Sequence, residues 1–401
     1  MIINEVVNSN LCTGCGICKS LYSNKVEMNC KELFNRPKQI KDFTKKETKE
    51  FKNICPGIYQ SSIDFKSPLH DDVWGQYFYS GKGYSLNDEI RYKSSSGGIL
   101  SQTAIFLLEH NIVSGIIHIG SDPLNPLENI VQVSKTREEV INKSGSRYSP
   151  ASPLVSVIEI ITSTPEKKYA FIGKPCDVTA LRQAQELHEN LKTQIPIVLS
   201  FFCAGTPSRK GVNNILTRFN VDSKGVKKFE FRGNGWPGET LVETETEKFK
   251  MKYEESWGKI LGPTIQNRCK ICADGIGENA DIVSADVWDA DERGYPKFEE
   301  TNGNGLVLSR SKIGNDLVKK MIDSNTIFSN DFNLDELKNI QPTQFERKCT
   351  IFPRILARKI FFKQNPIFLN QRIFKNMKFI SFHKLFRVFV GSILRVKKGS
   401  M

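Results

Sequence analysis

Cysteines are the residues of this 401-residue chain best suited to chemistry, because several of the ten stand at close and ordered spacing. Cys12, Cys15 and Cys18 follow one another at three-residue steps, and Cys55 lies directly before Pro56 farther along the chain. Three thiolates at this spacing can bind three corners of a cubane cluster, and a distant Cys-Pro supplies the fourth ligand, as in bacterial ferredoxin motifs. Zinc sites more often pair two separated Cys-x2-Cys units, so the triple favours iron and sulfide over zinc. We therefore predict one 4Fe–4S cluster on Cys12, Cys15, Cys18 and Cys55.

A second group of cysteines is dispersed and consists of Cys176, Cys203, Cys269 and Cys272. Cys176 and Cys203 each follow an expected strand, and the carboxyl ends of parallel strands meet at one edge of a sheet. The compact pair Cys269-x2-Cys272 could complete a second set of four ligands. Spacing alone leaves another interpretation open, in which Cys176 and Cys203 are small buried core residues, as is common for cysteine. Cys30 belongs to neither group and is interpreted as a bystander.

The segments around these cysteines alternate between strand and helix. Expected strands cover 112–120, 168–173, 196–203, 281–288 and 305–309, and expected helices cover 99–109, 178–188 and 208–219. This rhythm predicts an α/β core with a parallel sheet. Residues 227–253 alternate differently around the turn-rich 234–238, which predicts an antiparallel hairpin lying on the core and a fold that is α+β overall. We divide the chain into a small cysteine module over 1–63, a core over 64–345 and a tail over 346–401.

Charge is concentrated at the C-terminal end of the chain. The net charge is +13, yet residues 350–401 hold 12 Lys or Arg and no Asp or Glu, which leaves the rest nearly neutral. This asymmetry argues against nucleic-acid binding by the whole protein. A hydrophobic content of 39% predicts a globular chain. Neither a signal peptide nor a run of ~18 apolar residues is visible, so we expect a cytoplasmic protein, in which clustered cysteines point to metal.

The tail mixes these basic residues with nine phenylalanines. Pro353 and Pro366 are expected to divide it, and 370–396 is long enough for an amphipathic helix but too charged to span a membrane. Two interpretations remain open. Either the tail docks on an acidic partner or an anionic membrane, which would give a peripheral location at the inner membrane face, or its phenylalanines pack on the core while its lysines face water.

Seven motifs occur in order along the chain. They are KSSSGG at 93–98, GSRY at 145–148, FIGKPC at 171–176, FFCAGTPS at 201–208, FRGNGWPG at 231–238, RCKIC at 268–272 and ADIVSADVW at 280–288. Together they resemble the coenzyme F420 hydrogenase/dehydrogenase beta-subunit family, with its ferredoxin-like N-terminal module, over roughly residues 10–310. The resemblance implies a mixed α/β flavin-binding core, FAD and two 4Fe–4S clusters, the second held by the dispersed cysteines. Lys174 and Ala285 depart from the Thr and Gly more usual in these motifs, and neither change removes a ligand.

The resemblance directs attention to side chains that could hold a flavin. Ser95, Ser96, Gly97 and Gly98 precede an expected helix. Hydroxyls and free backbone N–H groups at a positive helix end suit a pyrophosphate. An ordinary Ser N-cap with a tight turn is the alternative.

The other candidates for flavin contact are Arg147, Tyr148, Gly233, Asn234, Gly235 and Trp236. Arg147 could pair with a phosphate, or it could be an exposed surface arginine. The glycine-rich turn could let backbone approach a flat ring on which Trp236 stacks, or it could be a plain hairpin turn with a packed aromatic. Lys174 lies beside a presumed cluster ligand and could stabilise an anionic reduced flavin. Lys174 and Trp236 are therefore the catalytic candidates.

The function expected from this resemblance is that of an iron–sulfur flavoprotein oxidoreductase. It would pass electrons between a hydride carrier, coenzyme F420 or similar, and a one-electron partner such as ferredoxin or another electron-transfer subunit. One alternative is a ferredoxin-dependent reductase of an organic substrate, for example in surface polysaccharide biosynthesis. A second alternative is a non-catalytic, metal-stabilised interaction protein.

Overall fold

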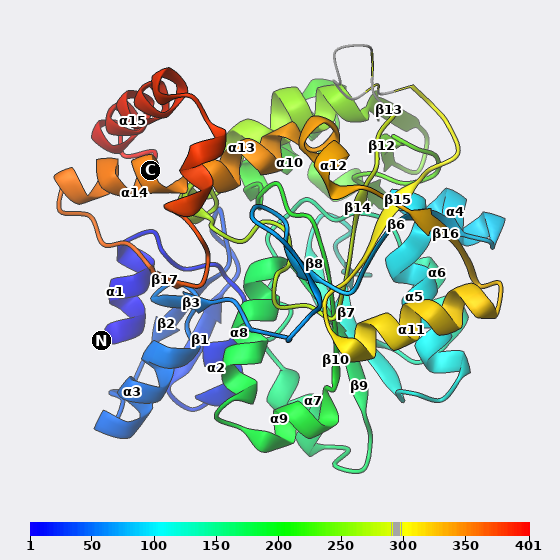
Figure 1. Ribbon diagram of the computed structural model, residues 1–401, viewed down its shortest axis with the longest axis horizontal. Coiled ribbons are helices and arrows are strands. Elements are labelled where there is room, and N and C mark those ends of the chain that lie inside the picture. Colours follow the sequence, from blue (N-terminus) through cyan, green and yellow to red (C-terminus); the bar gives the residue numbers. More distant parts are fainter. Residues whose placement is uncertain (290, 292–296, 298) are drawn as a thin grey trace.

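The computed structural model describes residues 1–289, 291, 297 and 299–401, and within them an eight-stranded sheet forms the centre of the molecule (Figure 1). Its strands are β6 (Tyr79–Ser85), β7 (Gly115–Ser121), β8 (Asn129–Ser134), β9 (Tyr169–Ile172), β10 (Ile197–Phe201), β14 (Ile282–Asp286), β15 (Gly305–Ser309) and β16 (Ile327–Asp331). The strand order is β16-β6-β15-β14-β10-β9-β7-β8. The central β14, β10, β9 and β7 are parallel, as the sequence predicts. The outer strands pair antiparallel, so the sheet is mixed.

Helices cover both faces of this sheet. One face carries α5 (Ile99–Glu109), α6 (Arg137–Asn142) and α11 (Lys312–Asp323), and the other carries α7 (Val157–Thr162), α8 (Pro175–Gln185), α9 (Glu189–Gln194) and α12 (Leu334–Ile340). Ala170 and Ile197 point towards the face covered by α5, α6 and α11, whereas their neighbours Phe171 and Val198 point towards the opposite face. Successive side chains of a strand point to opposite faces, so strands covered on both sides are apolar throughout. This is the reason that they appear in the sequence as uninterrupted apolar runs.

The helix after β9 begins earlier than expected. The sequence predicts it from residue 178, but α8 begins at Pro175, because proline is well suited to the first helical position. Lys174 is the N-cap, and its backbone N–H donates to the carboxylate of Asp177 at 3.1 Å. Cys176 therefore sits in the first turn of α8, at the carboxyl edge of the sheet.

Residues 227–253 form a separate small sheet of three strands. These strands are β11 (Lys228–Glu230), β12 (Glu239–Glu243) and β13 (Lys248–Lys252). The predicted antiparallel hairpin across residues 234–238 is confirmed by β11 and β12. The third strand was missed, because a second turn lies inside the stretch taken as one strand, where the Thr244 N–H donates to the Glu247 carbonyl at 2.9 Å. The sheet packs with α10 (Arg209–Phe219) and η3 (Glu254–Leu261) around its own apolar cluster.

The two ends of the chain meet on one side of the molecule (Figure 1). The N-terminal part contains α1 (Ile2–Asn8), α2 (Ile17–Leu21), β1 (Val26–Asn29), β2 (Arg36–Gln39), α3 (Lys45–Ile54), β3 (Tyr59–Ser61), β4 (Leu69–Asp71) and β5 (Gly75–Tyr77). The C-terminal part contains α13 (Pro342–Cys349), α14 (Ile351–Ile360), β17 (Ile367–Leu369), η6 (Lys375–Phe379) and α15 (Phe382–Lys397). β17 pairs in parallel with β3, so the tail extends the cysteine module.

The tail contains more regular structure than its two prolines suggest. Pro353 does not divide it, because this proline lies in the first turn of α14, where a missing N–H costs nothing. The predicted amphipathic helix exists as α15 but begins at Phe382, after Ser381 caps it. Within the described residues, none of the helices has the length and apolar character needed to cross a bilayer.

Candidate functional site

The first cysteine group lines one small cavity in the N-terminal part. Cys12, Cys15, Cys18 and Cys55 all face this cavity, between α1, α2 and α3. Gly16, with φ of 90°, caps α2, and a Cβ there would lie 2.8 Å from the backbone nitrogen of Val155. Only glycine fits this turn, which folds the three-cysteine loop back on itself. The structure therefore brings the four predicted ligands of the first group together.

Burial sets the protonation of these thiols. It raises the pKa of Cys15 to about 12, with further contributions from the charges of Asp177 and Cys12. Burial likewise raises the pKa of Cys12, Cys18 and Cys55. The Gly14 N–H donates to the Cys12 sulfur at 3.4 Å, the kind of contact that stabilises a ligating thiolate. Neutral thiols in a closed apolar space become good ligands when a cationic metal centre displaces their protons.

The second cysteine group is assembled from separate elements. Cys176 lies in α8, Cys203 follows β10, and Cys269 and Cys272 lie in and just after η5 (Asn267–Ile271). Burial raises the pKa of Cys176, and the charges of Asp177, Cys203 and Cys272 act in the same direction. Burial also raises the pKa of Cys203 to about 12, and the charges of Cys269 and Cys272 raise it in the same direction. The four thiols thus lie within electrostatic reach of one another, as the sequence predicts.

Neither cysteine group has the arrangement of a single-ion site. Within residues 1–289, 291, 297 and 299–401, no cluster of three or more His, Cys, Asp or Glu side chains is arranged to hold one metal ion.

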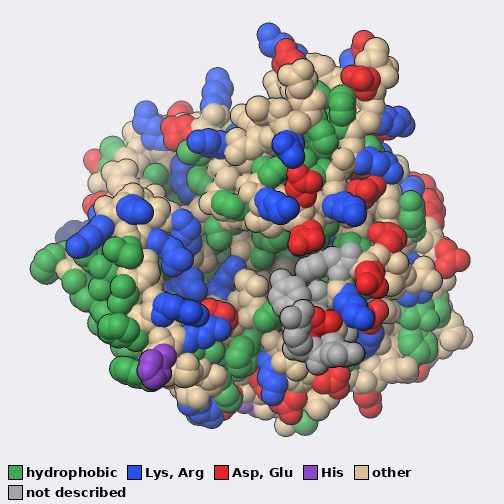
Figure 2. Space-filling view, turned by 90° about the horizontal axis from the view of Figure 1, so that it is seen from above, with side chains coloured by type: hydrophobic (Ala, Val, Ile, Leu, Met, Phe, Trp, Pro, Cys, Tyr) green, Lys and Arg blue, Asp and Glu red, His purple; other side chains and the backbone are tan. Residues whose placement is uncertain are grey.

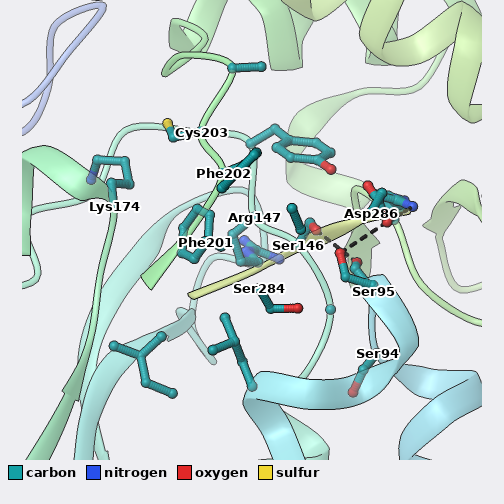
Figure 3. Close-up of a pocket in the computed structure, with 18 of the residues that line it drawn as sticks. Ser94, Ser95, Ser146, Arg147, Lys174, Phe201, Phe202, Cys203, Ser284 and Asp286 are labelled. Atoms are coloured by element: carbon teal, nitrogen blue, oxygen red, sulfur yellow. Dashed lines mark hydrogen bonds and ion pairs between the residues drawn. The ribbon is translucent and has the colours of Figure 1, made fainter. Parts of the chain in front are cut away.

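A cavity of about 630 Å³ lies beside the second cysteine group, at the carboxyl ends of β9, β10 and β14. Cys203 and Lys174 line one side of it, and Ser95 and Asp286 line the opposite side (Figure 3). Its volume falls in the range of cofactor-binding pockets. Cys203 therefore belongs both to the four-cysteine group and to the wall of the cavity.

Four buried polar atoms of residues in the cavity wall have no hydrogen-bond partner among the described residues. They are Asp177 Oδ1, Ser149 Oγ, Thr206 Oγ1 and Ser284 Oγ. Buried polar atoms are almost always hydrogen-bonded in folded proteins. One of these atoms is a carboxylate oxygen and three are hydroxyls, so residues of the cavity wall carry hydrogen-bonding groups that the protein itself leaves unsatisfied.

Sequence comparison decides the family of this chain. Profiles of the N-terminal and C-terminal parts of the coenzyme F420 hydrogenase/dehydrogenase beta subunit match residues 81–159 and 166–333. The chain belongs to this family.

Individual relatives agree with this assignment. The coenzyme F420-dependent sulfite reductase of Methanocaldococcus jannaschii is 22% identical over 86% of this chain, which spans 50% of that protein. The beta subunit of coenzyme F420 hydrogenase from Methanosarcina barkeri is 26% identical over 63% of this chain and 82% of its own length. The rice 7-hydroxymethyl chlorophyll a reductase is 22% identical over 55% of this chain and 43% of its own length. A chain of the F420-reducing nickel–iron hydrogenase complex from M. barkeri shares the fold, with a TM-score of 0.58 at 23% identity, covering 75% of this chain and 98% of that chain.

The serines and the glycines of the serine–glycine motif have different roles. Ser95 and Ser96 line the cavity, but Gly97 and Gly98 do not. Gly97 has φ of 68°, and a Cβ there would lie 2.9 Å from the carbonyl of Gly83 in β6. The glycines let the start of α5 pack on the sheet, while the serines face the cavity, where Ser95 and Ser146 share a hydrogen bond of 2.8 Å (Figure 3).

Arg147 and Tyr148 line the cavity, but the guanidinium of Arg147 is already engaged. It donates to the Asn129 side chain at 2.7 Å and to the carbonyls of Pro126, Glu128 and Phe229 at 2.8–3.1 Å. Burial lowers its pKa to about 10. The side chain thus ties β8 to the small sheet, and a phosphate would have to compete with these acceptors.

The glycine-rich turn of the family lies outside the cavity. Gly233, Asn234, Gly235 and Trp236 do not line it. The ring of Trp236 is buried and stacks on Trp288 at 4.4 Å, so protein already fills the face proposed for a flavin. The turn acts indirectly, through the Trp236 Nε1–H that donates to the Asp286 carboxylate at 2.8 Å.

Asp286 organises this side of the cavity, whereas the sequence indicated it only as a hydrogen-bonding residue near the second cluster and not as a cofactor-binding residue. It accepts from Ser96 Oγ at 3.0 Å and from both terminal nitrogens of Arg232 at 2.7 and 3.0 Å. Burial opposes its charge, but Arg232 outweighs burial and lowers the pKa of Asp286. Both residues stand in quoted motifs, FRGNGWPG and ADIVSADVW, so the signal that could have found them was present.

Lys174 is the predicted candidate that lies nearest the second cysteine group. Its ammonium is 2.7 Å from the carboxylate of Asp177, and both side chains are largely buried. Although burial opposes it, the charges of Asp177, Cys176 and Cys203 raise the pKa of Lys174 above its usual value. The cavity wall next to Cys203 therefore carries a buried Lys174–Asp177 ion pair. Lys143 and Lys259, which no motif marks, also line the cavity.

Proposed function

We propose that this family member is an iron–sulfur flavoprotein oxidoreductase. FAD would occupy the cavity, the two cysteine groups would each hold a 4Fe–4S cluster, and a hydride carrier such as coenzyme F420 would be the two-electron partner. The observation that carries the proposal is the position of Cys203, which lies both in the wall of the cavity and in the second four-cysteine group. The names of the relatives, which include a coenzyme F420-dependent sulfite reductase and the beta subunit of coenzyme F420 hydrogenase, support it.

A flavin takes two electrons as a hydride and releases them singly, which suits it to stand between a hydride carrier and one-electron clusters. The residues of this chain would serve that exchange by position and charge. The hydroxyls of Ser149, Thr206 and Ser284 would hydrogen-bond the flavin nucleotide. The ammonium of Lys174 would stabilise negative charge next to the second cluster. Apolar side chains such as Ile116 and Ile172 would exclude water from the cavity.

Contacts between the two cysteine groups support a second electron step towards the N-terminal part. Arg268, in η5, donates to the carbonyl of Pro56, directly after Cys55, at 3.1 Å. Gln266 donates to the carbonyl of Thr13 at 3.4 Å. Ile271 packs in the same apolar cluster as Cys12 and Cys18. The order cavity, second group, first group would place the first cluster nearest a ferredoxin or another electron-transfer subunit. The reducing cytoplasm, where free cysteines persist, is the location that we propose.

The proposal is tested on protein produced anaerobically with iron, sulfide and flavin supplied. Iron analysis should give about eight atoms per chain, and acid extraction should release FAD. Viologen-reduced protein should reduce coenzyme F420, and the loss of the deazaflavin absorbance measures this reaction. Protein that retains neither flavin nor iron would contradict the proposal and favour an interaction protein.

The same preparation separates the main proposal from its enzymatic alternative. Protein that holds both clusters and FAD but does not exchange electrons with coenzyme F420 would favour a ferredoxin-dependent reductase of an organic substrate. The rice relative, named for reduction of a chlorophyll derivative, is the observation that keeps this alternative in view.

A further inference from the structure

The last helix of the chain carries an exposed apolar ridge. Phe382, Phe386, Val390 and Leu394 recur every four residues of α15 and are 77%, 57%, 39% and 54% exposed. Residues four apart lie on one side of a helix, one above the other. These side chains therefore form a continuous strip, and strips of this kind mark interaction sites more often than single exposed apolar residues do.

The opposite side of α15 fixes the helix to the protein. Ser392 is buried, and Val396 packs in the apolar cluster that contains Ile271 and two cysteines of the first group. The interpretation that the tail phenylalanines pack on the core was therefore wrong for the ridge. It is also wrong for Phe362 and Phe374, which are 96% and 65% exposed.

Cations alone surround the ridge on its own helix. Arg387, Arg395, Lys397 and Lys398 make no ion pair with any described residue, whereas Lys384 is held by Glu346 at 2.8 Å. No acidic residue follows Glu346 in the sequence. Figure 2 shows this edge of the molecule, on the side of the C-terminal helices, as a hydrophobic area bordered by Lys and Arg side chains.

We propose that α15 docks flat on the surface of an anionic lipid bilayer. An apolar strip flanked only by cations matches an interface of acyl chains beneath negative headgroups, and aromatic residues favour that depth. The helix is too short and too charged to cross, so it would lie in the plane of the membrane. The proposal is independent of the redox function.

A second copy of the chain is a poorer occupant of this surface. A symmetric contact through the ridge would bring Arg387 and Arg395 of both copies together without an acidic counterpart on the helix. A protein partner would need both an apolar groove and a concentration of acidic side chains. A bilayer containing anionic lipid supplies both properties at once.

Vesicle co-sedimentation of the full-length, cofactor-loaded protein tests the proposal. We expect binding to phosphatidylglycerol–phosphatidylcholine vesicles, little binding to phosphatidylcholine alone, and partial release by salt. The double substitution Phe382→Ser and Phe386→Ser should raise the lipid concentration for half-binding at least about tenfold, because it removes two aromatic side chains that would insert into the bilayer. The substitutions Arg395→Gln and Lys397→Gln should weaken binding and reduce its salt dependence.

The matched control is Leu124→Ser, because Leu124 is 95% exposed on the connection between β7 and β8. This variant should bind vesicles like the unchanged protein. Circular dichroism and the iron content of each variant establish that it folds. The absence of vesicle binding by the unchanged protein would overturn the proposal, as would unaltered binding by the double phenylalanine variant. Concentration-dependent dimers that disappear in that variant, without vesicle binding, would assign the ridge to a second copy instead.

Discussion

The two cysteine groups of this molecule are built in different ways. The first takes three of its four cysteines from residues 12–18, and two glycines with positive φ, Gly14 and Gly16, shape the loop between them. The second takes its cysteines from α8, from the end of β10 and from η5. The first group is thus encoded in a short stretch of sequence, whereas the second exists only when the whole sheet is assembled.

The second group also depends on the C-terminal helices. Arg347, in α13, donates to the carbonyls of Cys203 and Ala204 at 3.2 and 2.7 Å. Arg354, in α14, donates to the carbonyl of Lys270 at 3.1 Å, and the ammonium of Lys270 donates to the carbonyl of Ser400 at 2.6 Å. A truncated tail would therefore damage the second group. For this reason, point substitutions on α15 test membrane docking better than removal of the tail does.

The largest expected effects come from removing one ligand of each group. Cys15→Ala should reduce the iron content from about eight to about four atoms per chain and leave FAD bound, because the first group does not line the cavity. Cys203→Ala should also halve the iron but weaken FAD binding, because Cys203 forms part of the cavity wall. Iron analysis and acid-extracted flavin, measured on both variants, check this contrast. Identical flavin content in the two variants would contradict it.

How far the sequence alone could predict the site follows the same division. The local loop of Cys12, Cys15 and Cys18 could be interpreted from spacing, because ligands close in sequence must be close in space. The convergence of Cys176 and Cys203 could be predicted from the rule that parallel strands end at one edge. The helix 99–109 was predicted to the residue, because two glycines stand directly before its apolar run.

What sequence reasoning missed depends on side-chain partners. Arg147 seemed a phosphate ligand, but its partners are backbone carbonyls from residues that only the folded chain brings close. Trp236 seemed a flavin platform, but Trp288 occupies its face. Neither fact is visible in a motif, because motifs fix the type of a residue and not its neighbours. The antiparallel direction of β15 was missed because its fully buried sequence looks like that of a parallel strand. The edge strands β16 and β8 were missed because they are only partly apolar and partly exposed.

The next largest effect is expected at Asp286, on the side of the cavity away from the cysteines. Asp286→Asn leaves the buried Arg232 guanidinium without its charged partner. Breaking a buried pair in this way destabilises a protein by roughly 3–5 kcal/mol. Urea unfolding at neutral pH measures the effect. Asp289→Asn is the matched control, since its 3.4 Å pair with Lys82 is exposed and should contribute at most about 1 kcal/mol.

The stabilisation from Asp286 should also depend on pH. Arg232 lowers the pKa of the folded-state carboxyl despite burial. A carboxyl with a lowered folded-state pKa stabilises the protein above its unfolded-state pKa of about 3.9, and this stability is lost as the pH falls below that value. The stability difference between the unchanged protein and Asp286→Asn should therefore be constant near neutral pH and shrink below about pH 4. A difference that grew on acidification would contradict the assignment.

A smaller effect is expected from loosening the second group while keeping all its ligands. Arg347→Leu removes the donors to the carbonyls of Cys203 and Ala204. Leaving a buried acceptor without its hydrogen bond costs about 1–3 kcal/mol of stability. Iron from the second group should then be lost faster to a chelator, while iron from the first group is lost at the unchanged rate. In a Cys15→Ala background, only the second group can hold iron, so all of the iron should be lost to the chelator at the faster rate. Lys384→Ala, which removes only the surface pair with Glu346, should leave both rates unchanged.

The smallest effect tests whether the unsatisfied hydroxyls mark the ligand. Ser284 Oγ and Ser80 Oγ are both buried without a hydrogen-bond partner, but only Ser284 lines the cavity. If a flavin nucleotide completes Ser284, Ser284→Ala should weaken FAD binding by about 1 kcal/mol, or roughly fivefold, and Ser80→Ala should not. Neither substitution should destabilise the flavin-free protein, because each removes a buried polar atom that has no partner there. Flavin titration of the two variants and their unfolding curves without flavin measure both quantities. If neither substitution changes the FAD affinity, the cavity holds the flavin away from β14. If both substitutions weaken FAD binding by the same factor, both serines act through packing.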